Sequence, residues 1–350
     1  MTRQRKPLRV VNSVAPIRIC DNGGWTDTWF ARCGKVFNIA VYPYAEVQVR
    51  VFRHHGSGAR ITINAENYGE RYTIAEPRGR YDKHPLLEAA IDFMKVPRDV
   101  AIEVSIHSEA PAGCSTGTSA AVSVALIGAL DCLTPGRMTA HEVAVAAHRI
   151  ETELLRQQCG IQDQFAAAYG GINYIEMHEY PRATVSPVRV PDSTWWDLES
   201  RLSLIYVGHS HSSSAVHEMV IRELEDAGPD AAKLRPLRRT AEKSKDALYA
   251  GNLAALGRAM IENTEAQRAL HPRLISADHQ RVIDVAKRRG AAGWKVNGAG
   301  GEGGSVTILS GPDQTVKRQM IREIEACSSK LRNIPIYLSR FGLRVWETKG

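Results

Sequence analysis

A run of small and hydroxyl-bearing residues at positions 111–120 is well suited to bind an anion. Its sequence, Pro-Ala-Gly-Cys-Ser-Thr-Gly-Thr-Ser-Ala, follows a strand-like stretch and enters an Ala-rich, helix-like one. Small residues let the backbone approach a ligand closely, and free N–H groups at the positive end of a helix attract phosphate. Thr118 and Ser119 add hydroxyls that can reach phosphate oxygens or Mg²⁺. No Gly-Lys-Ser/Thr follows, so this is not a Walker loop. A small-residue turn that serves only tight packing is the alternative.

Two carboxylates, Glu151 and Asp163, lie 12 residues apart in the next part of the chain. Glu151 is near the end of a predicted helix whose start at Thr139 carries a capping-box pattern. Asp163 belongs to the segment Cys-Gly-Ile-Gln-Asp-Gln at 159–164, and an isolated Asp there is most simply the N-cap of a short helix. As a pair, however, one acid can hold a metal ion while the other accepts a proton, which is the division of roles that phosphoryl transfer requires.

A third polar segment, residues 15–27, combines a glycine turn with groups that suit a polyol. Its sequence is Ala-Pro-Ile-Arg-Ile-Cys-Asp-Asn-Gly-Gly-Trp-Thr-Asp. Asp27 can accept hydrogen bonds from sugar hydroxyls, and the indole of Trp25 or Trp29 can cover the apolar face of a sugar ring. A strand that simply ends in a glycine turn is the alternative interpretation.

The strand and helix patterns around these segments predict an α+β protein with two lobes that meet near residue 185. The predicted strands are 36–53, 59–64, 100–107, 202–207, 294–297, 305–309 and 335–346. The predicted helices are 118–130, 139–154, 164–169, 213–227, 231–249, 253–270, 277–289 and 315–327. The order of elements after residue 186 resembles a split βαβ layout. We therefore expect an N-terminal lobe, 1–185, and a C-terminal lobe, 186–350.

The composition is that of an ordinary globular protein, with 350 residues of which 43% are hydrophobic and 24% charged. The net charge is +7, and four basic residues fall within the first nine, where we expect a solvated tail and no nucleic-acid binding. No apolar run reaches the roughly 18 residues that span a bilayer, so we expect no membrane insertion. The six cysteines lack metal-ligand or disulfide spacing. With no secretory signal pattern, a cytoplasmic protein is expected.

Four motifs resemble, in the same order, those of the GHMP kinases, which include galactokinase, homoserine kinase, mevalonate kinase and phosphomevalonate kinase. Pro16-x-Arg18 followed by Gly-Gly-x-Thr-Asp resembles their N-terminal motif, and 111–120 resembles their phosphate loop. Segment 159–164 is similar to the galactokinase catalytic segment, and Lys-Val-Asn-Gly-Ala-Gly-Gly-Glu-Gly-Gly at 295–304 resembles their C-terminal glycine motif. The matches span nearly the whole chain. The resemblance implies an ATP-dependent kinase with a two-lobed α+β body and a site between the lobes.

The resemblance also implies a role for each motif. Asp163 is expected to be the base toward the acceptor hydroxyl, with Arg18 steadying it or the phosphoryl group, and Ser119 and Glu151 are expected to hold Mg²⁺. The residues expected to wrap the ATP phosphates are Pro111, Gly113, Cys114, Ser115, Thr116, Gly117, Thr118 and Ser119. The residues expected to bind the acceptor are Gly24, Trp25, Thr26 and Asp27 in the first lobe, and Gly298, Ala299, Gly300 and Gly301 in the second.

Within the family, Gly-Gly-Trp-Thr-Asp-Thr at 23–28 and Gly-Thr-Ser at 117–119 resemble the branch of fucokinase and heptose 7-phosphate kinase. The sequence departs from the pattern at four places. One loop glycine is missing at 114–116, and Asp21-Asn22 stand where apolar or small residues are usual. Trp29 stands where fucokinases tend to have proline, and Glu302 interrupts the last glycine run. These departures leave the kinase prediction intact but bear on the acceptor.

For the acceptor we expect a neutral, fucose-like sugar that is phosphorylated at its anomeric 1-hydroxyl. We expect the enzyme itself to be a monomer or a homodimer. The acceptor motif contains no basic pair, whereas a sugar phosphate would need an Arg or Lys cluster. A kinase for a phosphorylated heptose remains an alternative, since Arg32, Lys35, His209 or His211 can supply positive charge. A non-catalytic sugar- and ATP-binding sensor is the other alternative, although it has no need of both Glu151 and Asp163.

Overall fold

The computed structural model describes residues 6–54, 59–74, 76–77, 79–209 and 213–348, and two β-sheets organise them. Within these residues the first sheet has nine strands in the order β13-β1-β2-β5-β3-β4, with β12 and β6 also pairing with β2, and β7 with β6. These pairs are antiparallel except β3 with β5. The strand bounds are Arg9–Asn22 (β1), Gly34–Arg53 (β2), Ile61–Ala65 (β3), Glu70–Ile74 (β4), Val100–Ser108 (β5), Ile172–Glu179 (β6), Arg182–Pro187 (β7), Tyr337–Leu338 (β12) and Arg344–Thr348 (β13).

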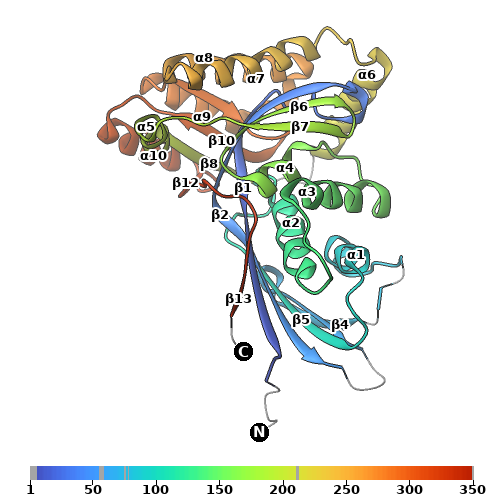
Figure 1. Ribbon diagram of the computed structural model, residues 1–350. Coiled ribbons are helices and arrows are strands. Elements are labelled where there is room, and N and C mark those ends of the chain that lie inside the picture. Colours follow the sequence, from blue (N-terminus) through green and yellow to red (C-terminus); the bar gives the residue numbers. More distant parts are fainter. Residues whose placement is uncertain (1–5, 55–58, 75, 78, 210–212, 349–350) are drawn as a thin grey trace.

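Four helices lie along one side of this sheet (Figure 1). They are α1 (Pro85–Met94), α2 (Thr118–Asp131), α3 (Ala140–Arg149) and α4 (Gln162–Tyr169), and a π-helical turn, η3 (Ile150–Leu154), continues α3. Helix α2 packs on β1 and β2 and is surrounded by the other three helices, so nearly all its side chains are buried. Its Ala-rich sequence fits this position, because small side chains allow close packing on every side. The start of α2 is thereby fixed against the end of β1.

The second sheet has the order β11-β8-β10-β9, and all its pairs are antiparallel. Its strands are Leu202–His209 (β8), Gly293–Val296 (β9), Gly303–Leu309 (β10) and Arg332–Ile334 (β11). The first and third of these strands in chain order are central, which is the split βαβ arrangement. The remaining helices are α5 (Asp192–Arg201), α6 (Ser213–Ala227), α7 (Leu234–Tyr249), α8 (Leu253–Leu270), α9 (Ala277–Arg288) and α10 (Gln314–Cys327), and the 3-10 turns are η1 (Trp29–Ala31), η2 (Glu66–Tyr68) and η4 (Pro272–Leu274).

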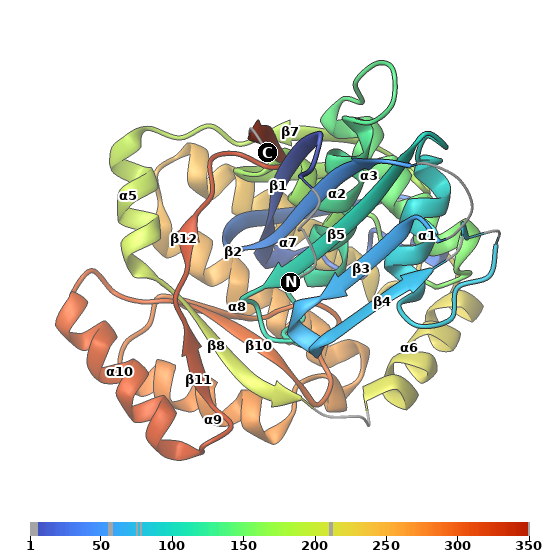
Figure 2. The same ribbon diagram turned by 90° about the horizontal axis from the view of Figure 1, so that it is seen from below.

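The two sheets are joined by the antiparallel pair α7 and α8. Helix α7 packs on β1 and β2 of the first sheet, whereas α8 packs on β9 of the second. Figure 2 shows α9 and α10 side by side next to the second sheet, over a separate apolar core. None of the described helices is long and apolar enough to cross a bilayer. The end of β1, the start of α2 and the β9–β10 connection therefore converge where the sheets meet.

The predicted α+β class and split βαβ layout are confirmed. The predicted helices at 253–270 and 118–130 agree with α8 and α2 to within one residue, and Thr139 does form a capping box with Glu142. The sequence patterns missed α1 and α5. The division near residue 185 falls within β7 and stays a prediction.

The predicted final strand region at 335–346 is confirmed only in part, because it contains two short strands, β12 and β13, that pair in the first sheet. Strand β11 completes the second sheet before Pro335, and the chain then returns to the first sheet as β12 and β13. The backbone N–H of Ser339 donates to the carbonyl of Ala40 at 2.9 Å, and the N–H of Leu343 donates to Ala168 at 3.1 Å. A proline cannot donate a ladder hydrogen bond, so the strand stops at Pro335 and its pairing changes.

Candidate active site

A cavity of about 630 Å³ opens where the two sheets meet, and four of the segments singled out in the sequence contribute to its wall. The described lining comes from 18–30, from 113–120, from 151–164, from α6 at 217–221 and from 298–299. The glycine-rich loop (residues 111–119) enters the cavity from Gly113 onward, whereas Pro111 does not line it. The predicted phosphate, metal, base and acceptor segments are thus brought together by the fold.

Arg18 and Asp163 form an ion pair in the cavity wall. Arg18 Nε donates to Asp163 Oδ1 at 2.8 Å, and Arg18 Nη1 donates to the carbonyl of Ser115 at 2.5 Å. Burial by itself would lower the pKa of Arg18, but the carboxylates of Asp163 and Asp21 outweigh this effect and raise the pKa above its ordinary value. The side chain of Asp163 remains 29% exposed. Arg18 therefore stays charged and links the glycine-rich loop to a carboxylate that still reaches the cavity.

The glycine-rich loop ends at a helix N-terminus that no side chain caps. Gly117 is the N-cap of α2, with φ of 71°, and makes no side-chain capping bond. This left-handed backbone conformation favours glycine, and a Cβ at this position would lie only 3.1 Å from Cγ of Asp163, so Asp163 would have to shift. The first N–H groups of a helix have no intrahelical partners and lie at its positive end. This uncapped terminus at the cavity fits the phosphates of a nucleotide.

Glu151 lies in the π-helical turn after α3, buried and facing the cavity. Burial raises the pKa of its carboxyl to about 7, opposed by Gln164 and reinforced by the negative charge of Asp163. Gln164 Nε2 donates to Glu151 Oε1 at 2.7 Å, and among the described residues no Lys or Arg pairs with Glu151. Ser119 lines the same cavity. A buried carboxylate without a Lys or Arg partner among the described residues, in the same cavity as a hydroxyl, fits Mg²⁺. This ion takes one or two protein oxygens plus phosphate oxygens and water.

Asp27 is a buried acid that follows the glycine turn at Gly23 and Gly24. It is 2% exposed, and its Oδ2 accepts from the backbone N–H of Gln162 at 3.1 Å. Burial raises the pKa of Asp27 to about 6, although this hydrogen bond opposes the shift. A Cβ on Gly160 would lie only 2.2 Å from Asp27 Oδ2, so residue 160 has to be small. The contact between 159–164 and Asp27 places the predicted base segment against the predicted acceptor residue.

The two tryptophans of the acceptor motif line the cavity from an apolar cluster. Trp25 is 8% exposed, and its ring packs edge-on against His217, with centroids 6.0 Å apart. Trp29 packs against Phe30, and its Nε1 donates to Glu225 on α6 at 2.6 Å. Helix α6 is therefore fastened to the acceptor motif by ring contacts and by one hydrogen bond.

Thr26 and Gly24 do not line the cavity, unlike what the sequence predicts for an acceptor site. The hydroxyl of Thr26 donates to the carbonyls of Gly23 and Lys35, at 2.7 and 3.1 Å, and accepts from the N–H of Lys35. It is fully buried and its bonding capacity is used within the fold. Gly24 packs against Asp21 instead, where a Cβ would come within 3.0 Å of Oδ2. Both residues shape the turn that positions Asp27.

Of the four residues predicted to bind the acceptor from the second sheet, two line the cavity and two do not. Gly298 and Ala299 line the cavity, and a Cβ on Gly298 would lie 3.0 Å from that of Ser115 in the glycine-rich loop. Gly300 and Gly301 do not line it. A Cβ on Gly300 would meet the carbonyl of Leu274 at 2.4 Å, so this glycine lets the segment pack against η4.

Several side chains of the site were not found from the sequence. They are Asp21, Gln162, Gln164, His217, Glu218 and Lys295. The signal for Gln162 and Gln164 was available, because they flank Asp163 in the segment already chosen. Asp21 was noticed only as a departure from the family pattern. Lys295 was noticed only as the first residue of the segment 295–304, and nothing local marks His217. The places of both side chains depend on how α6 and β9 pack.

The described lining is rich in negative charge and poor in positive charge. Its carboxylates are Asp21, Asp27, Glu151, Asp163 and Glu218. Its one guanidinium is Arg18, already paired with Asp163, and burial lowers the pKa of His217, which favours the neutral ring. Lys35 and Arg32 lie outside the lining, and Lys35 Nζ is 2.5 Å from Glu242 Oε1. Of the histidines considered for a phosphate, His211 and the side chain of His209 lie outside what the structure describes.

Comparisons with known proteins find similar chains among the small-molecule kinases. Residues 85–171 match the model of the GHMP kinases N terminal domain. The chain is 24% identical to D-glycero-alpha-D-manno-heptose 7-phosphate kinase of Campylobacter jejuni, over 97% of this chain and all of that protein. It is 23% identical to L-fucokinase/L-fucose-1-P guanylyltransferase of Bacteroides fragilis, over 96% of this chain and 38% of that protein.

A solved structure has the same fold over almost the full length. A D-glycero-D-manno-heptose 1-phosphate kinase from Bacteroides thetaiotaomicron superimposes with a TM-score of 0.72 at 22% identity, covering 96% of this chain and 98% of that one. The fold is thus the same as that of this kinase. The chain belongs to the GHMP kinase superfamily and is an ATP-dependent phosphotransferase with an alcohol group as acceptor.

Proposed function

We propose that this protein uses ATP and Mg²⁺ to phosphorylate the anomeric 1-hydroxyl of a neutral, fucose-like monosaccharide. The observation that carries the proposal is the charge of the cavity: Arg18 is the only Lys or Arg in its described lining, and Asp163 already holds it. Asp27 offers a buried acceptor for sugar hydroxyls, and Trp25 and Trp29 offer apolar wall. Similarity to a fucokinase supports the same acceptor class and position.

In this proposal each residue of the site has a defined task. Bound ATP supplies the γ-phosphoryl group, and Mg²⁺ neutralises charge on its phosphates. Residues 113–119 hold the phosphates with backbone N–H groups, and Ser119 and Glu151 provide oxygen ligands for the metal. Asp163 accepts the proton of the sugar hydroxyl, and Arg18 fixes the direction of its carboxylate through the 2.8 Å bond to Oδ1. Asp27 orients the sugar, and Gly298 and Ala299 close the wall opposite.

A kinase for a phosphorylated heptose is the second candidate, because similarity to a heptose 7-phosphate kinase extends over both whole chains. A phosphate on the acceptor needs a free cation. Lys35 is engaged by Glu242, and Arg32 is exposed outside the cavity. The described lining therefore favours the neutral sugar. A non-catalytic sensor is disfavoured because Glu151 and Asp163 both reach the cavity. The cytoplasmic location, the monomer or homodimer state and the absence of nucleic-acid or membrane partners remain proposals.

The test is ADP release over a panel of free and phosphorylated monosaccharides, followed by direct competition between the best free sugar and its terminal phosphate ester. We expect turnover with a free 6-deoxyhexose or a related hexose, and a kcat/KM at least equal to that of the ester. A preference for the ester of tenfold or more, about 1.4 kcal/mol of transition-state binding, would establish the heptose-phosphate type of kinase instead. Tight binding of sugar and ATP without ADP release would establish the sensor.

A further inference from the structure

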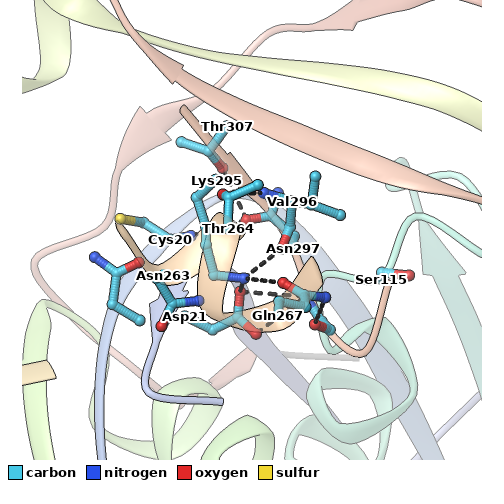
Figure 3. Close-up of polar contacts among 12 residues, drawn as sticks. Cys20, Asp21, Ser115, Asn263, Thr264, Gln267, Lys295, Val296, Asn297 and Thr307 are labelled. Atoms are coloured by element: carbon cyan, nitrogen blue, oxygen red, sulfur yellow. Dashed lines mark hydrogen bonds and ion pairs between the residues drawn. The ribbon is translucent and has the colours of Figure 1, made fainter. Parts of the chain in front are cut away.

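A buried pair of opposite charges joins the two sheets beside the cavity. Asp21, on β1, is 0% exposed, and Lys295, on β9, is 1% exposed. Lys295 Nζ lies 3.3 Å from Asp21 Oδ1 and donates to Gln267 Oε1 at 3.2 Å and to the carbonyl of Val296. Figure 3 shows these side chains converging from the two sheets and from α8.

The carboxylate of Asp21 is also bonded to the glycine segment of the second sheet. The backbone N–H of Gly298 lies 3.1 Å from Oδ1 and 3.0 Å from Oδ2. Gly298 is itself a cavity residue and touches Ser115 of the glycine-rich loop. On its other side, Asp21 Oδ1 is 3.9 Å from Nη1 of Arg18. One carboxylate therefore contacts Lys295, Gly298 and Arg18.

These contacts form a line of alternating charges that ends at the proposed base. In order, the groups are Lys295, Asp21, Arg18 and Asp163. Arg18 is held at both ends, by Asp21 and by Asp163, while its Nη1 bonds the carbonyl of Ser115. Movement of Asp21 would remove one of the two ion-pair contacts of Arg18 and the hydrogen bonds of the Gly298 N–H at the same time. The position of Asp163 relative to the glycine-rich loop thus depends on a carboxylate that is itself fully buried.

The charges are not needed merely to hold the sheets together. Neutral bonds already do so: the N–H of Cys20 donates to Asn297 Oδ1 at 3.0 Å, and Ser305 Oγ donates to the carbonyl of Cys114 at 2.6 Å. Burying two ions is costly, and a buried ion pair can often be replaced by neutral or apolar groups without loss of stability. Stability alone therefore does not explain why Asp21 and Lys295 are charged.

We propose that Asp21 is a positioning residue for phosphoryl transfer, and that Lys295 holds its carboxylate in the orientation that fixes both Arg18 and Gly298. This inference rests on the proposed function. Asp21 is 0% exposed and acts through Arg18. Displacement of a reacting group by about 1 Å can cost a factor of 10² in rate, so the effect of losing Asp21 should fall on kcat.

The experiment compares Asp21→Asn, Lys295→Met and the double variant, with Thr264→Val as a matched control. The double variant removes both charges at once and so avoids leaving one of them buried without a partner. The hydroxyl of Thr264 bonds the carbonyl of Trp294 on β9 at 3.2 Å, so the control removes a buried polar contact to the same strand without touching the charges. Each protein is measured for Tm, for KM of ATP and of the best acceptor in the sugar panel, and for kcat.

We expect the double variant to keep a Tm within a few degrees of wild type, with both KM values within about threefold. Its kcat should fall by about 10- to 100-fold, whereas Thr264→Val should lower Tm and keep kcat within about twofold. A folded double variant with kcat within threefold of wild type would overturn the inference, and so would a rise in KM at unchanged kcat. If the wild type releases no ADP with any acceptor, it is the proposed function that fails.

Discussion

The buried Glu151 makes a quantitative prediction about stability without metal. Its pKa of about 7 lies above the ordinary 4.5, because burial disfavours the charged form. The native protein therefore holds a proton on Glu151 that the unfolded chain has already lost between these two pH values. It follows that the free energy of unfolding declines as pH rises from about 4.5 to about 7, and stays reduced above that. Glu151→Gln, neutral at every pH, should be free of this decline.

The size of the effect follows from the shift. At 1.36 kcal/mol per pKa unit, a shift from 4.5 to about 7 corresponds to about 3 kcal/mol at most. The glutamine keeps an oxygen that can accept from Gln164 Nε2, the donor that lies 2.7 Å from Oε1 in the wild type. In chelator at pH 8, Glu151→Gln should therefore be more stable than wild type by up to about 3 kcal/mol. Near pH 4.5 the two proteins should be almost equal.

Urea denaturation in EDTA at pH 5, 6, 7 and 8 measures this difference by linear extrapolation. Glu153→Gln is the control, because Glu153 is on the same turn but is 54% exposed and paired with Arg149 at 2.9 Å. It should change stability by a few tenths of a kcal/mol, in the destabilising direction. Mg²⁺ with ADP should narrow the gap between wild type and Glu151→Gln, since a bound cation stabilises the carboxylate. If the difference in unfolding free energy between wild type and Glu151→Gln stays constant from pH 5 to pH 8, the loss of stability at high pH does not come from this buried carboxylate.

Two further variants examine the base and the acceptor pocket. Asp163→Asn should leave ATP binding nearly intact and lower kcat by about 10² to 10⁴, the usual range for loss of a general base; retention of more than half the wild-type kcat would contradict that role. Gly160→Ala should lower kcat/KM for the acceptor at least tenfold at unchanged KM for ATP, because its Cβ would lie 2.2 Å from Asp27 Oδ2 and overpacking typically costs about 1–3 kcal/mol. The control is Gly311→Ala, because its Cβ would have no neighbour closer than the Gly290 carbonyl at 3.7 Å, and it should behave as wild type. Equal kcat/KM values for the two alanine variants would refute the steric argument.

The segments of the site were predictable because their chemistry is local. The glycine-rich loop combines small residues with a helix start, and the structure places it at the N-terminus of α2. Glu151 and Asp163 were chosen as a pair, and both line the cavity. What the local sequence does not contain is the direction of a side chain. The hydroxyl of Thr26 could serve a ligand or a backbone carbonyl, and only the fold shows that it bonds Gly23.

Contacts between distant strands were the part that could not be predicted. Asp21 and Gly298 are separated by 277 positions, and their contact depends on how β1 of one sheet meets β9 and its following loop in the other. A lysine in a strand pattern, such as Lys295, ordinarily indicates an exposed face. The same limit applies to β12 and β13, whose short patterns do not indicate which of the two sheets they join.

The pairing of β1 with β13 has a consequence for synthesis of the protein. Strand β1 lies between β2 and β13 in the first sheet (Figure 1), yet more than 300 residues separate it from β13 in the chain. At about 5–20 residues per second, the ribosome needs roughly 15–70 s to supply that partner. Throughout this interval one edge of β1 is an open template for pairing with other chains. The nascent protein should therefore depend on chaperone protection, or on the speed of its own translation, more than its finished fold suggests.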